Sequence, residues 1–185
     1  MPERSLRRDD TRLYLLVLRC QAGDASAFDR LMNEFGGRTL AHLRGLVGED
    51  AEDVQQEVWL TVYRQLSGLS NPRAFRTWLF QTTRHRAIDF LRARKREREL
   101  AEEAAREREP AIAPADELFD LDGSSLGATL NTLIPIHREV LVLRYQEDMS
   151  YGEMAIVAGC SIGTIRSRLH AAKRRLQEAL RRETP

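Results

Sequence analysis

The sequence predicts an all-α protein made of two small helical domains joined by a flexible linker. Apolar residues recur every three to four positions over most of the chain, which is the period of a helix with one buried face. Patterns typical of β-strands are nearly absent. A segment poor in apolar residues and rich in charge and proline separates two periodic stretches, which therefore predict two small domains.

The composition excludes several classes of protein. The 185 residues are 42% hydrophobic, enough for one ordinary domain or two small ones. The 2 cysteines and 4 histidines are too few for a disulfide framework or a conventional four-ligand zinc site. The longest apolar run, Leu15–Leu18, is far shorter than the roughly 20 residues that span a bilayer. We therefore expect a cytoplasmic protein in a reducing compartment, with no cofactor, no metal and no membrane insertion.

Residues 23–98 predict a first domain of three packed helices, preceded over residues 1–22 by a tail and a leading helix. Glycines 36–37 interrupt the first of these helices and predict a kink or a break. The second helix opens with acids, which suit the positive end of a helix dipole. A loop at Ser67–Pro72 separates it from the third helix, which is predicted from about Ala74 to Arg98.

Residues 99–125 predict an acidic flexible linker. Pro110 and Pro114 interrupt any helix, and the low apolar content cannot offset the conformational entropy of an ordered chain. The helical period resumes over residues 126–181, which predict a second domain.

Charge is segregated along the chain, although the net charge is only +1 at pH 7. Acids without bases occupy Glu49–Glu57, whereas bases dominate Arg84–Arg98 and Ser161–Leu176. Two basic segments in different domains indicate that a polyanion is held at two places, while the acidic faces meet another partner.

The second domain has the pattern of a helix-turn-helix. Ser150 and Glu153 form a capping box that starts one helix, and Ser161 can cap the next. Gly159 suits a turn that needs a positive φ, and Ile165 supplies an apolar anchor on the second helix. The polar face of that helix is basic and free of acids, as a recognition helix in the major groove requires. Its candidate DNA contacts are Thr164, Arg166, Ser167, Arg168, His170, Lys173 and Arg174.

A solvated basic helix in a three-helix bundle would also be rich in arginine. The cap, the turn glycine and the acid-free face together favour DNA binding over that alternative. Cys160 lies in the predicted turn, where a small packing residue is favoured over a redox sensor because no second cysteine is near in sequence.

Motifs on both sides of the linker resemble a known family. The first domain carries Gln21–Asp24, Asp50–Val58 and Phe75–Arg92, and the second carries Arg138–Leu176 with its core at Gly163–Ala171. In this order they resemble regions 2 and 4 of bacterial RNA polymerase sigma factors, in the extracytoplasmic-function (ECF, group 4) sigma-70 family. The resemblance covers nearly the whole chain apart from the tail and the linker.

The resemblance implies a function that composition alone does not show. A sigma factor binds core RNA polymerase, directs it to promoter DNA and helps to open the duplex, and it is often controlled by an anti-sigma factor. The second-domain recognition helix is implied to read the −35 element. The implied polymerase contacts are Asp50, Asp53, Gln56 and Glu57. The implied contacts to the −10 element are Arg84, His85, Asp89 and Arg92.

Two positions depart from the family pattern. His85 stands where the family usually has asparagine, and Thr82 where it usually has an apolar residue. Histidine still donates or accepts at a base edge, so we expect an unusual −10 preference. The alternative is an incidental surface histidine.

Base capture after strand opening needs aromatic or arginine planes, and the sequence offers two aromatic candidates near the loop at Ser67–Arg73. Trp78 falls on the apolar stripe of its helix, which favours a place in the core. Phe80 is not decided by the pattern. For the acids of Glu49–Glu57 on the second predicted helix, the alternative to a binding surface is a merely solvated face.

The sequence contains no enzyme motif, which favours a specificity subunit without catalytic activity. A stand-alone repressor or activator with the same helix-turn-helix is the main alternative; it would bind duplex DNA without polymerase, as a symmetric dimer. A serine recombinase is a more distant alternative, because the serine and arginine cluster on an α/β domain that it needs is not visible.

Overall fold

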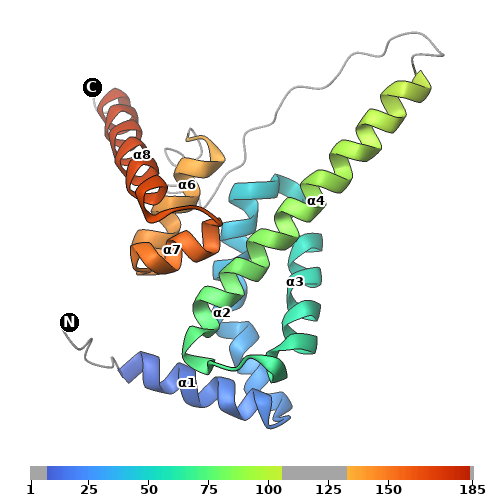
Figure 1. Ribbon diagram of the computed structural model, residues 1–185, viewed down its shortest axis with the longest axis vertical. Helices are drawn as coiled ribbons and strands as arrows, with labels where there is room; N and C mark the ends of the chain where they lie inside the picture. Colours follow the sequence, from blue (N-terminus) through green and yellow to red (C-terminus); the bar gives the residue numbers. More distant parts are fainter. Residues whose placement is uncertain (1–7, 106–132, 184–185) are drawn as a thin grey trace.

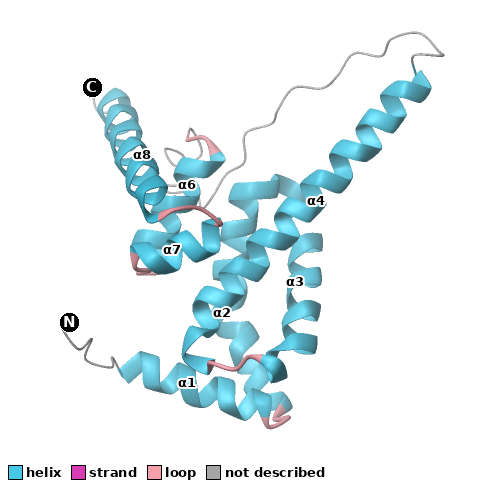
Figure 2. Cartoon of the chain, viewed as in Figure 1, coloured by secondary structure: helices cyan, strands magenta, loops and turns pink. Residues whose placement is uncertain are grey.

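Figure 1 shows the chain as a computed structural model, which describes residues 8–105 and 133–183. All regular structure within these two ranges is helical, and no strand occurs in them (Figure 2). The prediction of an all-α protein is confirmed.

The first domain and its leading helix contain four long helices. They are α1 (Arg8–Gln21), α2 (Ala25–Val47), α3 (Ala51–Gln65) and α4 (Phe75–Ala105). Short 3-10 turns connect them at η1 (Gly48–Asp50), η2 (Leu66–Gly68) and η3 (Pro72–Ala74). Helices α2, α3 and α4 pack side by side, and α1 lies across their lower end (Figure 1).

Helix α2 begins at an aspartate cap and runs unbroken through the glycine pair. The side chain of Asp24 accepts a hydrogen bond from the Ala27 amide at 3.1 Å. Gln55 of α3 donates to the Gly36 carbonyl oxygen at 2.6 Å. A buried stripe that includes Leu31 and Phe35 packs the helix through this region, so tertiary packing outweighs the cost of about 1 kcal/mol for each mid-helix glycine. A break at this point, one of the two predicted outcomes, is therefore wrong.

Aromatic rings fill the centre of the first domain. Phe35 and Phe75 are fully buried and meet edge to face, with ring centroids 5.5 Å apart. Phe80 is also fully buried, and its ring meets His42 at 5.4 Å. Phe80 is thus a core residue and is excluded as a surface on which a base could stack.

Helix α4 is longer than predicted, because it continues past Arg98 to Ala105. Its last turns are rich in Ala, Glu and Arg, which are strong helix formers. An ion pair of 3.5 Å between Lys95 and Glu99 adds i,i+4 support. The predicted linker is therefore helical over residues 99–105, and the rest of it lies outside the described residues.

The second domain contains the predicted helix-turn-helix. Its elements are α6 (Pro135–Leu141), the π-helical turn η4 (Val142–Gln146), α7 (Tyr151–Ala158) and α8 (Ile162–Glu183). The capping box is present, with the Glu153 amide 3.2 Å from Ser150 Oγ and the Ser150 amide 2.8 Å from Glu153 Oε2. Gly159 has φ of 60°, in the left-handed region, and Ile165 is fully buried. These features confirm the predicted turn between α7 and α8.

Replacing Gly159 by alanine should lower the stability of the second domain by about 1–2 kcal/mol, because a Cβ atom is strained at this left-handed φ. Gly163→Ala is the matched control, since Gly163 is helical and an added Cβ would lie 3.6 Å from Ser161 Oγ, an ordinary contact. Hydrogen exchange of the α7 and α8 amides measures both effects. Equal protection in the two variants would contradict the assigned turn geometry.

The two domains lie against each other. Helix α4 packs on α7, and α2 packs on α6 (Figure 1). Gly45 of α2 permits a close approach, because a Cβ atom there would lie 3.2 Å from Cδ of Arg138. The recognition helix α8 thus lies one helix layer away from α4.

Candidate nucleic-acid and polymerase interface

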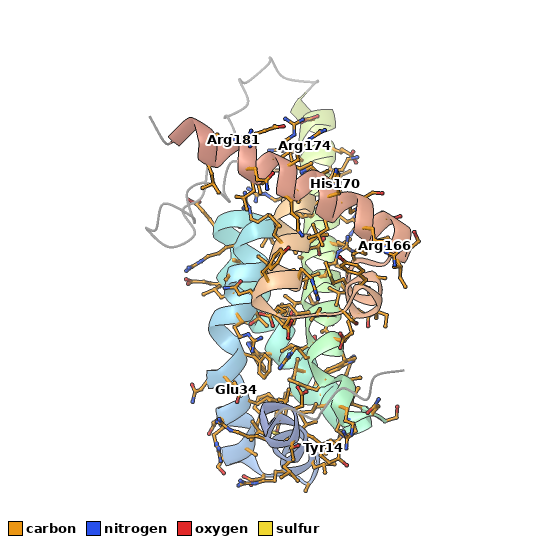
Figure 3. The ribbon with its side chains drawn as sticks, turned by 90° about the vertical axis from the view of Figure 1, so that its left-hand side faces the viewer. Tyr14, Glu34, Arg166, His170, Arg174 and Arg181 are labelled. Carbon is orange, nitrogen blue, oxygen red and sulfur yellow. The ribbon has the colours of Figure 1, made fainter. Side chains whose placement is uncertain are left out.

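Helix α8 presents a basic face away from the core. Ile165, Leu169 and Ala172 point inward and are buried. Arg166, His170 and Arg174 follow one another along the helix (Figure 3). Of the predicted −35 contacts, the exposed ones are Arg166, Ser167, His170, Lys173 and Arg174, and Thr164 is half-buried.

Two of these cations lie over the rings of neighbouring tyrosines. The Arg166 guanidinium lies 5.8 Å from the ring centre of Tyr151. Lys173 lies 5.5 Å from the ring centre of Tyr145, and a hydrogen bond from its ammonium group to Tyr145 raises the pKa of Lys173, so the lysine stays charged.

Arg168 differs from the other predicted −35 contacts. It is half-buried, and its Nη1 lies 3.6 Å from the sulfur of Cys160 at the edge of the core. The structure therefore separates Arg168 from the exposed face of α8. Cys160 is partly buried against the core, in agreement with the predicted packing role.

Helix α4 carries a second candidate face. His85, Asp89 and Arg92 are exposed at i, i+4 and i+7, so they share one side of the helix. The Nη1 atom of Arg92 lies 3.9 Å from Oδ1 of Asp89. Arg84, the fourth predicted −10 contact, points elsewhere: its Nε donates to Glu139 of the second domain at 2.8 Å.

Sequence reasoning missed Gln81, which lies four positions before His85 and therefore on the same face of α4. Trp78 lies one turn earlier and packs against the core at the ring of Phe75, with centroids 6.1 Å apart. Trp78 also forms the wall of a surface hollow whose other lining residues are Arg64, Gln65, Ser67, Gly68, Leu69 and Ser70. The four-residue spacing from His85 is the signal that finds Gln81.

A side chain of α1 holds the loop of this hollow. Gln21 Nε2 donates to the carbonyl oxygens of Leu66 at 3.0 Å and Leu69 at 2.8 Å. These two partly buried hydrogen bonds hold the loop next to the indole of Trp78. The arrangement offers an aromatic wall beside polar loop groups, which suits an unstacked base.

Helix α3 carries the acidic face. Asp53, Gln56 and Glu57 are exposed and line a groove with Leu60 and with Phe90 of α4. Tyr63, farther along α3, is 71% exposed. Asp50 is not part of this group, because its carboxylate pairs with Arg94 of α4. Exposed acids beside exposed apolar side chains are typical of a protein-docking surface.

Two buried acids in the second domain were also missed by sequence reasoning. Burial raises the pKa of both Glu139 and Glu147, although contacts with Arg84 and Arg38 act in the opposite direction. Burial also lowers the pKa of His42, beside Glu139, to about 4, so its imidazole is neutral near pH 7. Their arginine partners lie 55 and 109 residues away in sequence, and no local pattern signals contacts of that kind.

Neither range of described residues contains a helix long and apolar enough to cross a membrane. Nor do the described His, Cys, Asp and Glu side chains form a group of three or more that could hold a metal ion.

Comparison with known proteins gives family matches in both domains. Residues 31–97 match the family model for sigma-70 region 2, and residues 124–176 match that for sigma-70 region 4. The chain is 31% identical over 177 residues to the RNA polymerase sigma-H factor of Pseudomonas aeruginosa, covering 89% of this chain and 92% of that protein. It is 33% identical over 166 residues to the ECF sigma factor SigE of Mycolicibacterium smegmatis, covering 85% of this chain but 64% of that protein.

Two solved structures are similar in fold. One is CnrH in complex with the cytosolic domain of CnrY, with a TM-score of 0.61 and 26% identity over 93% of this chain and 99% of that one. The other is the sigma factor RpoE in complex with the anti-sigma factor NepR from Bartonella quintana, with a TM-score of 0.59 and 30% identity over 83% of this chain and 96% of that one.

The chain belongs to the sigma-70 family of bacterial RNA polymerase sigma factors, within the ECF group. Sigma factors of this family direct RNA polymerase to promoters at the start of transcription. The resemblance inferred from the sequence motifs is confirmed.

Proposed function

We propose that this protein binds core RNA polymerase, directs it to promoters with a −10 and a −35 element, and assists strand opening at the −10 element. The supporting observation is that exposed bases occur on two helices of different domains, at Arg92, Lys95 and Arg96 on α4 and along the basic face of α8, together with an acidic groove on α3. A simple repressor needs only the basic face of α8.

The upstream element is assigned to α8. Arg166 and Ser167 occupy the N-terminal half of this recognition helix, where helix-turn-helix proteins contact base edges. Lys173 and Arg174 lie nearer the other end and suit phosphate contacts, which add affinity without sequence preference.

The −10 element is assigned to α4. His85, with Gln81 on the same face, would contact the displaced strand, and the hollow beside Trp78 would take an unstacked base. Arg92 supplies phosphate contact at the basic end of this face.

Polymerase docking is assigned to the groove of α3, at Asp53, Gln56 and Glu57. The protein acts as a specificity subunit with no catalytic step of its own, and it works in the cytoplasm. Because CnrH and RpoE are each bound to a partner, CnrY and NepR respectively, we also propose an anti-sigma factor as a partner of this chain.

Transcription with purified core polymerase and a randomised promoter library tests the proposal. The expected result is that the protein co-purifies with the core enzyme and selects templates with two paired elements. Tight binding to duplex DNA by the protein alone, without polymerase association, would support a repressor instead.

Reversing charge at the docking groove should weaken polymerase binding. Asp53→Lys with Glu57→Lys places two cations where the proposal has two acids, and like charges across an interface cost several kcal/mol. Asp29→Lys with Glu34→Lys, at two exposed positions on α2, is the control for the same change in net charge. Fluorescence anisotropy with labelled core polymerase measures both affinities, and an unchanged affinity in the groove variant would refute the docking assignment.

A further inference from the structure

The contact between the two domains includes two ion pairs that bury charge. Glu147 of the second domain accepts hydrogen bonds from the Nε and Nη2 atoms of Arg38 on α2, the first at 3.0 Å. Glu139 on α6 accepts from Arg84 on α4 at 2.8 Å. A third arginine of the first domain, Arg76, lies with its Nη1 3.4 Å from the main-chain oxygen of Glu147.

Both acids are buried where the first domain covers them. The side chains of Glu139 and Glu147 are 1% and 0% exposed, while those of Arg84 and Arg38 are 19% and 30% exposed. These acids are contacted by Arg38 and His42 of α2 and by Arg84 of α4, all of which belong to the first domain. Separation of the domains would therefore return both carboxylates and both guanidinium groups to water.

The backbone of the second domain directs Glu147 at this contact. The residue directly follows the π-helical turn η4, and the next residue, Asp148, has φ of 50°, a left-handed value that is uncommon for a residue other than glycine. Local distortions of this kind cluster at functional and switch positions.

We propose that these two ion pairs form a latch, Arg38–Glu147 and Arg84–Glu139, that holds the free protein in a closed state unable to engage both promoter elements. The inference rests on the proposed function. One part of the inhibition is local, because the latch removes Arg84, a candidate −10 contact, from the DNA-facing surface of α4.

The second part of the inhibition is geometric. Helix α8 packs on α7 and α7 packs on α4, so the two DNA-reading helices are separated by two helix spacings, roughly 20 Å. Elements about 25 base pairs apart lie on the order of 85 Å apart at 3.4 Å per base pair. The closed arrangement cannot span that distance. The 27 residues of 106–132 have a contour length of up to about 90 Å, so the chain length permits the domains to separate.

A latch of this kind is easily opened. The desolvation of buried ion pairs largely cancels their Coulomb attraction, so they add little net stability while remaining sensitive to the loss of one partner. A polymerase surface that competes for either domain could then shift the equilibrium toward the open state.

The test compares a double variant, which carries both Glu139→Gln and Glu147→Gln, with the wild-type protein. Both proteins are measured in the absence of polymerase. The neutral amides keep the size of the side chains but leave the arginines without a counter-charge. We expect a larger radius of gyration by small-angle X-ray scattering. We also expect about tenfold tighter binding of a short fluorescent single-stranded DNA of randomised sequence, the factor for a wild type that is about 90% closed.

The matched control is Glu34→Gln with Glu49→Gln, which removes two exposed acids outside the latch. Glu34 lies in the first half of α2 (Figure 3). Arg38→Gln breaks one pair from the other side, so the test remains decisive if circular dichroism shows that the first variant is not folded. An unchanged radius of gyration, or expansion without a gain in DNA affinity beyond that of the control, would overturn the latch. Failure of the wild type to transcribe with core polymerase would instead overturn the proposed function.

Discussion

Arg166→Ala is expected to reduce discrimination between correct and altered −35 sequences by about 1–3 kcal/mol, roughly 5-fold to 150-fold. Arg166 is exposed near the start of the recognition helix, where side chains reach base edges, and its guanidinium lies 5.8 Å from the ring centre of Tyr151. A bidentate contact to guanine would be lost in the variant. Competition binding of the reconstituted holoenzyme to promoters that differ at single −35 positions measures the effect.

The matched control is Arg181→Ala, which removes the same charge near the other end of α8 (Figure 3). This control should weaken binding to all promoters about equally. If Arg166→Ala also weakens every promoter equally, Arg166 contacts only phosphate and the assignment of base reading to this position is wrong.

Phe75→Ala is expected to destabilise the first domain by about 3–5 kcal/mol, which is the usual cost of removing a buried aromatic side chain. Phe75 is fully buried at the first residue of α4 and meets the ring of Phe35 on α2 edge to face. Its loss leaves a cavity between the helix that carries the −10 face and the helix on which it packs. Unfolding in urea, followed by the fluorescence of Trp59 and Trp78, reports on this domain because both tryptophans lie in it.

Leu15→Ala, at a position that is 54% exposed on α1, is the control for loss of an apolar side chain at the surface. Surface changes of this kind usually stay within about 0.5 kcal/mol. A Phe75 variant as stable as this control would show that the helices repack without cost, and the described core would then be wrong.

Local patterns predicted the helix-turn-helix well because its signals are short-range. The Ser150–Glu153 capping box, the left-handed turn at Gly159 and the buried anchor Ile165 lie within sixteen residues, and the structure has all three. The extra turns of α4 are not predicted, because the apolar period ends near Arg98. Ala, Glu and Arg sustain it to Ala105 by propensity and by surface ion pairs.

The placement of candidate site residues was only partly predictable. Helical spacing grouped His85, Asp89 and Arg92 on one exposed face, as the structure has them. The same spacing did not show that Arg84 turns toward Glu139 of the second domain. Nor did it show that Arg168 lies beside Cys160 in the turn before α8, or that Asp50 pairs with Arg94. The sequence pattern leaves Phe80 undecided, and the structure buries it against His42 of α2.

The sequence by itself determined the helical class, the helix-turn-helix and the family, because periodicity, caps and motifs are local properties of the chain. Only the tertiary structure decided which charges are buried against the other domain. Glu139 and Glu147 find their arginines at separations of 55 and 109 residues, and such pairs form through the packing of whole helices. A charge is inexpensive in water and costly in a protein interior, so its role depends on what folding places beside it.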